Sequence, residues 1–242
     1  MTPTNLRHDG TVIRYDASVV ELMEPKLFDA AWLQASEIWQ GSSTGRSKAH
    51  FFHYAGRDMV LRHFHRGGLV GRFNRDLYLR VRAEDSRPFR EFDLLCEMHA
   101  DGLPVPLPVA AQYVPSGAFY RAALITQRIP DARPFQDVLR EAIPASSLWL
   151  AIGANIRKLH NHGIYHSDLN CRNILIDTSA RVWFIDFDKC EKRMPGAWEQ
   201  ATLERLKRSL RKLTNEDENV QWPEEGWTDL LAGYTNETAH PD

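Results

Sequence analysis

The sequence has few cysteines, almost no net charge and no long apolar run. Its three cysteines, Cys96, Cys171 and Cys190, are odd in number and lack CxxC spacing, so neither a disulfide framework nor a zinc site is expected. The formal net charge of -2 argues against a protein that holds nucleic acid through bulk charge. No apolar signal region opens the chain, and no uncharged run approaches the roughly 20 residues of a transmembrane helix. We therefore expect a cytoplasmic protein with reduced thiols and no nucleic-acid partner.

The N-terminal half has alternating helix-like and strand-like patterns. Apolar residues recur at helical spacing over residues 28–40, which predicts a helix. Two β-type runs, residues 49–54 and 58–64, are separated by a short connection containing glycine, which predicts an antiparallel hairpin. A second helix is predicted over residues 89–100, because Asp101-Gly102 is a typical helix terminator.

The C-terminal half is richer in helical pattern. Prolines at alternate positions over residues 104–108 exclude a helix there and lead into strand-like sequence. A long helix is predicted over residues 146–163, and the apolar runs 173–177 and 181–187 are typical of a small hairpin. This order predicts a β-rich N-terminal part and a helical C-terminal part, divided near residues 127–131.

The strongest motif is HSDLNCRN at residues 166–173, followed by IDFD at residues 185–188. Its order and spacing resemble the catalytic loop and the metal-binding DFG element of kinases. The resemblance implies an α+β, bilobal protein-kinase-like fold. The N-lobe, residues 1–126, would contain a β-sheet and one helix, and residues 127–242 would form a reduced helical C-lobe.

The kinase resemblance gives roles to the residues of the motif. Asp168 is the candidate catalytic base, since an attacking hydroxyl must lose a proton to a nearby carboxylate. Asn173 and Asp186 supply the oxygen ligands that Mg²⁺ prefers, and the ion would hold the phosphates of ATP. A lone Asp or Asn is more often a turn former or helix cap, but the combined spacing outweighs that alternative. His166 is expected to brace the loop.

The N-lobe of such a kinase supplies a phosphate-covering loop and a cation that a helix carboxylate orients. Gly41 and Gly45 lie in a loop whose backbone N–H groups would approach phosphate, although its sequence is not GxGxxG. Arg62 stands where the family pattern V-A-I-K has its lysine, and Lys48 is the alternative cation. Glu91 is the expected partner of Arg62, or else a solvated first-turn carboxylate. Residues of the expected hinge would bind adenine through their backbone groups, among them Gln127 and Ile129.

The stretch after Asp188 contains no APE element and is too short for the large helical subdomain of a eukaryotic-type protein kinase. Instead, four segments together resemble the 3-deoxy-D-manno-octulosonic acid (Kdo) kinases of Gram-negative bacteria, over roughly residues 41–213. The segments are residues 60–73, 89–111, 165–177 and 204–213. The resemblance implies ATP-dependent phosphorylation of the 4-hydroxyl of Kdo on a lipid A precursor. It also implies a peripheral location at the cytoplasmic face of the inner membrane.

Two basic segments fit an anionic partner. The first contains Arg62, His63, His65, Arg66 and Arg72, and its alternative interpretation is a solvated hairpin rim. The second is a helical stretch, residues 203–213, with a leucine stripe on one side and cations on the others. It favours contact with the anionic inner-membrane surface or, equally, packing of its leucines onto the C-lobe.

Asn170 and Arg172 lie inside the catalytic loop and are expected to face the acceptor. Protein kinases commonly have lysine at the position of Asn170, so its amide favours a non-peptide hydroxyl. The alternatives are a small-molecule phosphotransferase of the aminoglycoside-kinase type, an atypical Rio-like protein kinase, and a nucleotide-binding scaffold without catalysis. An acidic pocket for a cationic drug would favour the first of these, but the loop over residues 166–173 has few acidic residues.

Overall fold

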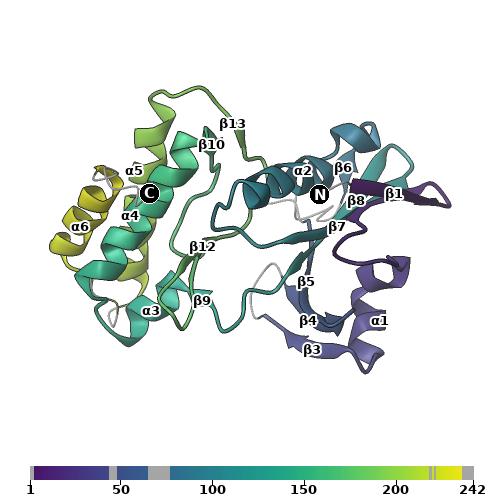
Figure 1. Ribbon diagram of the computed structural model, residues 1–242, viewed down its shortest axis with the longest axis horizontal. Coiled ribbons are helices and arrows are strands. Elements are labelled where there is room, and N and C mark those ends of the chain that lie inside the picture. The colour runs from purple at the N-terminus through teal and green to yellow at the C-terminus, as the bar shows by residue number, and fades with distance from the viewer. Residues whose placement is uncertain (1–2, 44–47, 65–76, 218–219, 221, 236–242) are drawn as a thin grey trace. The chain divides into compact units, whose positions relative to one another are not determined.

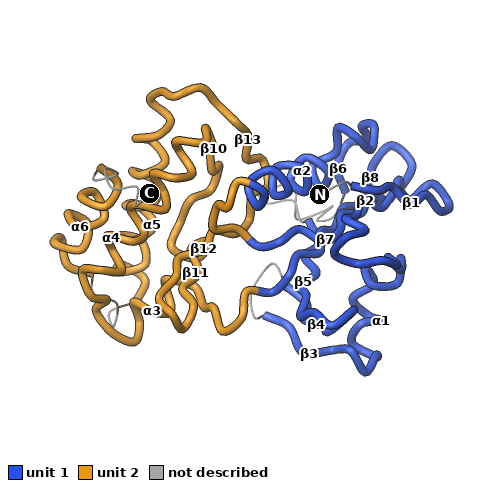
Figure 2. The backbone as a smooth tube through the Cα atoms, in the orientation of Figure 1, with its two compact units in different colours: residues 1–100, 106–128 blue, residues 101–105, 129–242 orange. Residues whose placement is uncertain are grey.

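The computed structural model describes the chain except for residues 1–2, 44–47, 65–76, 218–219, 221 and 236–242. The chain divides into two compact units (Figure 2). Unit 1 comprises residues 1–100 and 106–128, and unit 2 comprises residues 101–105 and 129–242. The fold is mixed α and β with an antiparallel main sheet.

Unit 1 is built on an eight-stranded antiparallel sheet with the order β1-β2-β7-β8-β5-β4-β3, in which β6 also pairs with β8. The strands are β1 (Pro3–His8), β2 (Thr11–Asp16), β3 (Trp39–Ser42), β4 (Ala49–Tyr54), β5 (Arg57–His63), β6 (Tyr78–Leu79), β7 (Pro108–Ser116) and β8 (Phe119–Gln127). The predicted hairpin is confirmed as β4 and β5. Ala55 and Gly56 connect them with φ of 50° and 72°, the left-handed pattern of a tight two-residue hairpin turn.

The helix predicted over residues 28–40 was wrong for most of its length. A 3₁₀ turn, η1 (Pro25–Phe28), is followed by the short helix α1 (Ala30–Ala35), which the Asp29 carboxylate caps. From Trp39 the chain is β3, which pairs with β4 through a bulge between Trp39 and Gly41. The edge pairing with β4 therefore overrides the helical periodicity of the sequence, and Gly41 and Ser42 belong to a strand rather than to the predicted loop.

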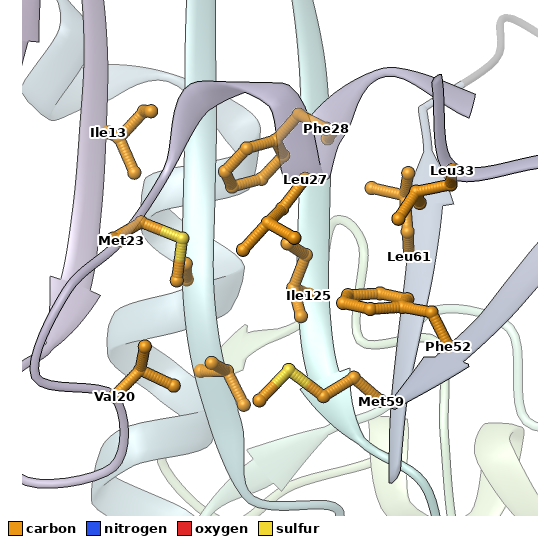
Figure 3. Close-up of a cluster of buried hydrophobic side chains, with 13 residues drawn as sticks. Ile13, Val20, Met23, Leu27, Phe28, Leu33, Phe52, Met59, Leu61 and Ile125 are labelled. Atoms are coloured by element: carbon orange, nitrogen blue, oxygen red, sulfur yellow. The ribbon is translucent and has the colours of Figure 1, made fainter. Parts of the chain in front are cut away.

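The two faces of the sheet in unit 1 are covered by different segments. On one face, η1 and α1 bury an apolar cluster against the strands (Figure 3). It includes Leu27, Phe28, Leu33, Phe52, Met59 and Leu61. Helix α2 (Arg87–Ala100) packs on β7 and β8 (Figure 1), and Gly102, with φ of 70°, lies in the turn after its end. Side chains alternate along β5: His63 reaches the Phe28 carbonyl, whereas Arg62 reaches α2.

Unit 2 contains the helices α3 (Phe135–Glu141), α4 (Ser146–Asn161), α5 (Trp198–Glu216) and α6 (Glu224–Thr235). The predicted long helix is confirmed as α4, whereas α6 was not predicted. Gly153 on α4 and Gly233 on α6 allow close approach of these two helices. A Cβ atom on Gly153 would lie 1.9 Å from the Leu230 carbonyl oxygen, and one on Gly233 would lie 2.1 Å from that of Leu150.

The leucine stripe of α5 is buried. Leu203, Leu206, Leu210 and Leu213 are each no more than 3% exposed. This burial confirms the packing alternative and removes the stripe as a membrane-facing surface, because the apolar side chains are already covered by protein. In the part of the chain that the structure describes, no helix combines the length and apolar character needed to cross a bilayer.

Short strands in unit 2 position the motif residues. β11 (Ile174–Ile176) pairs with β12 (Val182–Phe184), which confirms the second predicted hairpin, and with β9 (Arg133–Pro134). β10 (Ile164–Tyr165) pairs with β13 (Glu191–Lys192). The HSDLNCRN loop therefore runs from β10 to β11, and the IDFD segment directly follows β12.

Candidate active site

The loop at residues 166–173 is closed by hydrogen bonds among its own residues. The side-chain amides of Asn170 and Asn173 both donate to the backbone carbonyl of Asp168, each at 2.9 Å. The Asn170 amide oxygen accepts from the backbone N–H of Arg172 at 2.9 Å. The Asp168 side chain is exposed, and no described residue hydrogen-bonds to its carboxylate. The loop therefore fixes the backbone of Asp168 and leaves its carboxylate available to a ligand.

Asn173 and Asp186 lie at the same end of the β11–β12 hairpin. The backbone N–H of Ile185 donates to the Asn173 carbonyl at 3.0 Å, and Asp186 is the next residue. The side-chain nitrogen of Asn173 donates to the Asp168 carbonyl. Among described residues, no group donates a hydrogen bond to Asn173 Oδ1. Asp186 has φ of 67°, a left-handed conformation that is uncommon outside glycine and concentrated at functional sites.

His166 connects the loop to the segment that contains Asp186. Its Nδ1 accepts from the backbone N–H of Asp168 at 3.2 Å, so its Nε2 donates to the Ile185 carbonyl at 3.1 Å. The ring is 1% exposed and lies 4.8 Å from the ring of Phe187. Burial lowers the pKa of His166 from its usual value, which favours the neutral form that this pair of bonds needs. The bracing role expected for His166 is confirmed by these contacts.

The donors at the hairpin end suit a hard divalent cation. Asn173 Oδ1 and the Asp186 carboxylate are oxygen ligands, and Mg²⁺ commonly takes one or two carboxylates together with phosphate oxygens and water. Within the described ranges there is no group of three or more His, Cys, Asp or Glu side chains able to hold a metal. The chemistry of these two donors fits a magnesium ion whose remaining ligands come from phosphate and water.

Unit 1 holds the predicted cation and its carboxylate together. Arg62 on β5 forms an ion pair with Glu91 on α2, and the two side chains are 24% and 2% exposed. The Arg62 guanidinium also lies 4.7 Å from the ring centre of Phe64. Glu91 is therefore not a solvated first-turn carboxylate but the buried partner of Arg62.

The other predicted nucleotide-binding residues lie in several parts of the chain. Gly41 lies in β3 with φ of 117°, Lys48 is exposed just before β4, and Gly45 lies outside the described residues. Gln127 ends β8 in unit 1, where its N–H donates to the Leu107 carbonyl at 2.8 Å, and Ile129 begins the second stretch of unit 2. Of the first basic segment, Arg62 and His63 are described, whereas His65, Arg66 and Arg72 are not.

A cavity of about 240 Å³ opens beside Asp168, wholly within unit 2. Its lining comes from the start of α3, the loop at residues 166–173 and the end of α5, and includes Gln136, Asp168, Asn170, Arg172, Lys212 and Glu216. Asn170 and Arg172, which are expected to face the acceptor, both line this cavity. Sequence reasoning missed Gln136, which carries no motif signal, and assigned Lys212 to the basic face of a helix.

Comparisons with known proteins identify the family. The model of the lipopolysaccharide kinase (Kdo/WaaP) family matches residues 30–234. A 3-deoxy-D-manno-octulosonic acid kinase of Vibrio parahaemolyticus is 41% identical over 206 residues, covering 85% of this chain and 87% of its own length. The protein of the same name from Haemophilus influenzae is 37% identical over 231 residues, covering 92% and 95%. That of Photobacterium profundum is 36% identical over 226 residues, covering 93% and 95%.

Proposed function

Because the chain belongs to the lipopolysaccharide kinase (Kdo/WaaP) family, we propose that it transfers the γ-phosphate of ATP to the 4-hydroxyl of Kdo on a Kdo-bearing lipid A precursor. The relatives named 3-deoxy-D-manno-octulosonic acid kinase are similar to it along most of the chain. The observation that carries the proposal is the exposed Asp168 carboxylate on a loop that is bonded to the hairpin bearing Asn173 and Asp186. In this proposal unit 1 is the N-lobe and unit 2 the C-lobe of a kinase.

Asp168 is the catalytic base in this mechanism. It accepts the proton of the sugar hydroxyl as the oxygen forms its bond to the γ-phosphorus, and the bond from that phosphorus to the bridging oxygen of ADP breaks. The amides of Asn170 and Asn173 hold the Asp168 backbone, so the main chain that carries the carboxylate is fixed before the acceptor binds.

Asn173 Oδ1 and the Asp186 carboxylate would hold magnesium, which neutralises charge on the phosphate oxygens when it is bound. His166 fixes the spacing between base and ligand, since one ring bonds to the backbone of both segments. In unit 1, Arg62 would bind the α- and β-phosphates with Glu91 orienting its guanidinium. Gly41, Gly45 and Lys48 would cover the phosphates, and backbone groups at Gln127 and Ile129 would bind adenine.

Because the proposed acceptor carries a lipid, we expect the protein to act at the cytoplasmic face of the inner membrane. Because the leucines of α5 are buried, any contact with anionic headgroups would be made by exposed cations of this helix, such as Arg208 and Arg211. Such contact would be electrostatic and therefore weakened by salt.

The decisive experiment is mass spectrometry of the glycolipid after incubation with the protein, ATP and magnesium. One added phosphate on the Kdo residue, absent with Asp168→Ala and Asp168→Asn, is the expected result. Fragmentation of the product would give the hydroxyl that carries the phosphate. Undiminished transfer by both variants would remove Asp168 as the base. Parallel incubations with an aminoglycoside and with protein serine test the alternative acceptors, and phosphate there but not on Kdo would overturn the proposed acceptor.

A further inference from the structure

We propose that the cavity beside Asp168 is the subsite for the acceptor sugar, in which Arg172 binds the sugar's carboxylate and Lys212 adds a second positive charge. This inference rests on the proposed function, since it names the groups that recognise an acidic sugar at the proposed catalytic base. It assigns a role to two elements outside the kinase motifs, the start of α3 and the end of α5.

The cavity has the size and lining of a monosaccharide site. At about 240 Å³ it has room for one sugar ring but not for a whole glycolipid. Its polar lining includes the amides of Gln136 and Asn170 and the carboxylate of Glu216, groups that hydrogen-bond sugar hydroxyls. Asp168 lies in the same lining, so a sugar held here has its hydroxyls next to the proposed base.

Hydrogen bonds position the Arg172 side chain so that it can bind a carboxylate. Its Nε donates to Oε1 of Gln136 at 2.9 Å, and its backbone N–H is bonded to Asn170. In the described part of the chain, the two terminal nitrogens of its guanidinium have no hydrogen-bond partner. A planar fork with one side fixed and its terminal donors available suits bidentate binding of a carboxylate.

Lys212 supplies a positive charge, and its only described ion pair is a weak, exposed one. Its ammonium lies 3.6 Å from Glu216 one helical turn on, and the two side chains are 73% and 53% exposed. An exposed pair of this kind is weak, so a ligand carboxylate competes with it readily. Glu216 would repel the ligand's carboxylate, which places that group toward Arg172 and the hydroxyls toward Glu216.

The arrangement predicts selection for acidic over neutral sugars. A neutral acceptor would leave the Arg172 guanidinium without its anionic partner in the bound complex, whereas a sugar acid satisfies it. Selectivity for the carboxylate therefore tests the assignment directly, separately from catalysis.

The test compares the Kdo-bearing lipid A precursor with its Kdo methyl ester as acceptors. For the unmodified chain we expect kcat/KM for the ester to be about 10- to 100-fold lower, the range of a charge-assisted hydrogen-bonded contact. Arg172→Met should raise the acceptor KM by a similar factor and remove most of the preference. Lys212→Met should raise it about 3- to 10-fold, since Lys212 is exposed. In both variants the KM for ATP should be unchanged.

Lys158→Met is the matched control, because Lys158 is an exposed lysine of α4 outside the cavity lining. It should keep the full preference. Equal phosphorylation of acid and ester by the unmodified chain, or full preference in both Arg172→Met and Lys212→Met, would overturn the subsite while leaving the proposed function intact. Transfer to neither acceptor by the unmodified chain would instead overturn the proposed function and the subsite with it. Lys212→Met keeps the test valid even where Arg172→Met disturbs the catalytic loop.

Discussion

The guanidinium of Arg62 on β5 is paired with the carboxylate of Glu91 on α2, and only 2% of the Glu91 side chain is exposed. The pair joins the sheet to the helix on the face opposite η1 and α1. Lysine is the residue that the kinase pattern has at the position of Arg62. Arginine keeps the positive charge of lysine and has more N–H donors.

Replacing Arg62 should affect both nucleotide use and stability. Arg62→Met should lower kcat/KM for ATP about 10- to 100-fold, the scale of a lost charge-assisted contact. It should also cost about 2 kcal/mol of unfolding free energy, less than for a fully buried pair because Arg62 is partly exposed. Steady-state kinetics with ATP varied and urea unfolding give the two quantities.

Arg62→Lys separates the effect of charge from that of geometry, since lysine keeps the positive charge but lacks the planar, paired N–H donors of the guanidinium. Its kinetic loss should be smaller than that of Arg62→Met. Lys48→Met tests the alternative cation. A loss of kcat/KM for ATP in Lys48→Met together with unaltered kinetics in Arg62→Met would assign the phosphate contact to Lys48.

The magnesium requirement should depend on Asn173 and Asp186. Asp186→Asn removes the one charged ligand, and Asn173→Ala removes the neutral one together with its bond to the Asp168 carbonyl. We expect Asp186→Asn to need a higher magnesium concentration for half-maximal rate than Asn173→Ala, because a charged carboxylate oxygen binds a hard cation more strongly than a neutral amide oxygen does. Magnesium titrations at fixed ATP measure this. A titration of Asp186→Asn that superimposes on that of the unmodified chain would exclude Asp186 as a ligand.

Sequence patterns predicted the parts of the fold that depend on local signals. The β4–β5 hairpin has glycine in its turn, α2 ends just before Asp101-Gly102, and the β11–β12 hairpin has apolar runs on both sides of a turn. The β3 strand was mispredicted because pairing with β4 decides its conformation, and that partner is not visible in local periodicity. Helix α6 was missed because it is specified by contact with α4.

For the candidate site, order and spacing located the motif residues because they lie in two short segments close together in the sequence, residues 166–173 and 185–188. Gln136 could not be found in this way. Its relation to Arg172 spans 36 positions and exists only when α3 is folded against the loop. Lys212 was visible as a cation, but the sequence does not give which side of a helix faces the cavity at Asp168.

Stability should fall in weak acid because of His160. Its side chain is buried, with Nδ1 2.7 Å from the Tyr234 hydroxyl. Burial, with the nearby Arg157 charge, lowers its pKa to about 4 from 6.5. Between these values the unfolded chain binds more protons, so stability present above pH 6.5 is lost as pH falls toward 4. The loss between pH 7 and pH 5 should be about 2 kcal/mol for this group. Urea unfolding at the two pH values measures it.

His160→Gln should reduce that difference by most of this amount. The lowered pKa values of His50 and His166 contribute a loss in the same direction, which remains in this variant. His162→Gln is the control, because His162 is exposed at the end of the same helix. An acid-induced loss as large in His160→Gln as in the unmodified chain would show that His160 is not its source.

Gly153, where α4 contacts α6, should tolerate an added methyl group poorly. Alanine normally stabilises a helix interior relative to glycine by roughly 1 kcal/mol. At Gly153 the new Cβ would lie 1.9 Å from the Leu230 carbonyl oxygen, so the helices must separate. We therefore expect Gly153→Ala to lower the unfolding free energy by about 1–3 kcal/mol. Gly196→Ala is the control, since its nearest neighbour would be 3.7 Å away. Equal urea midpoints for the two variants would mean that α4 and α6 do not pack this closely.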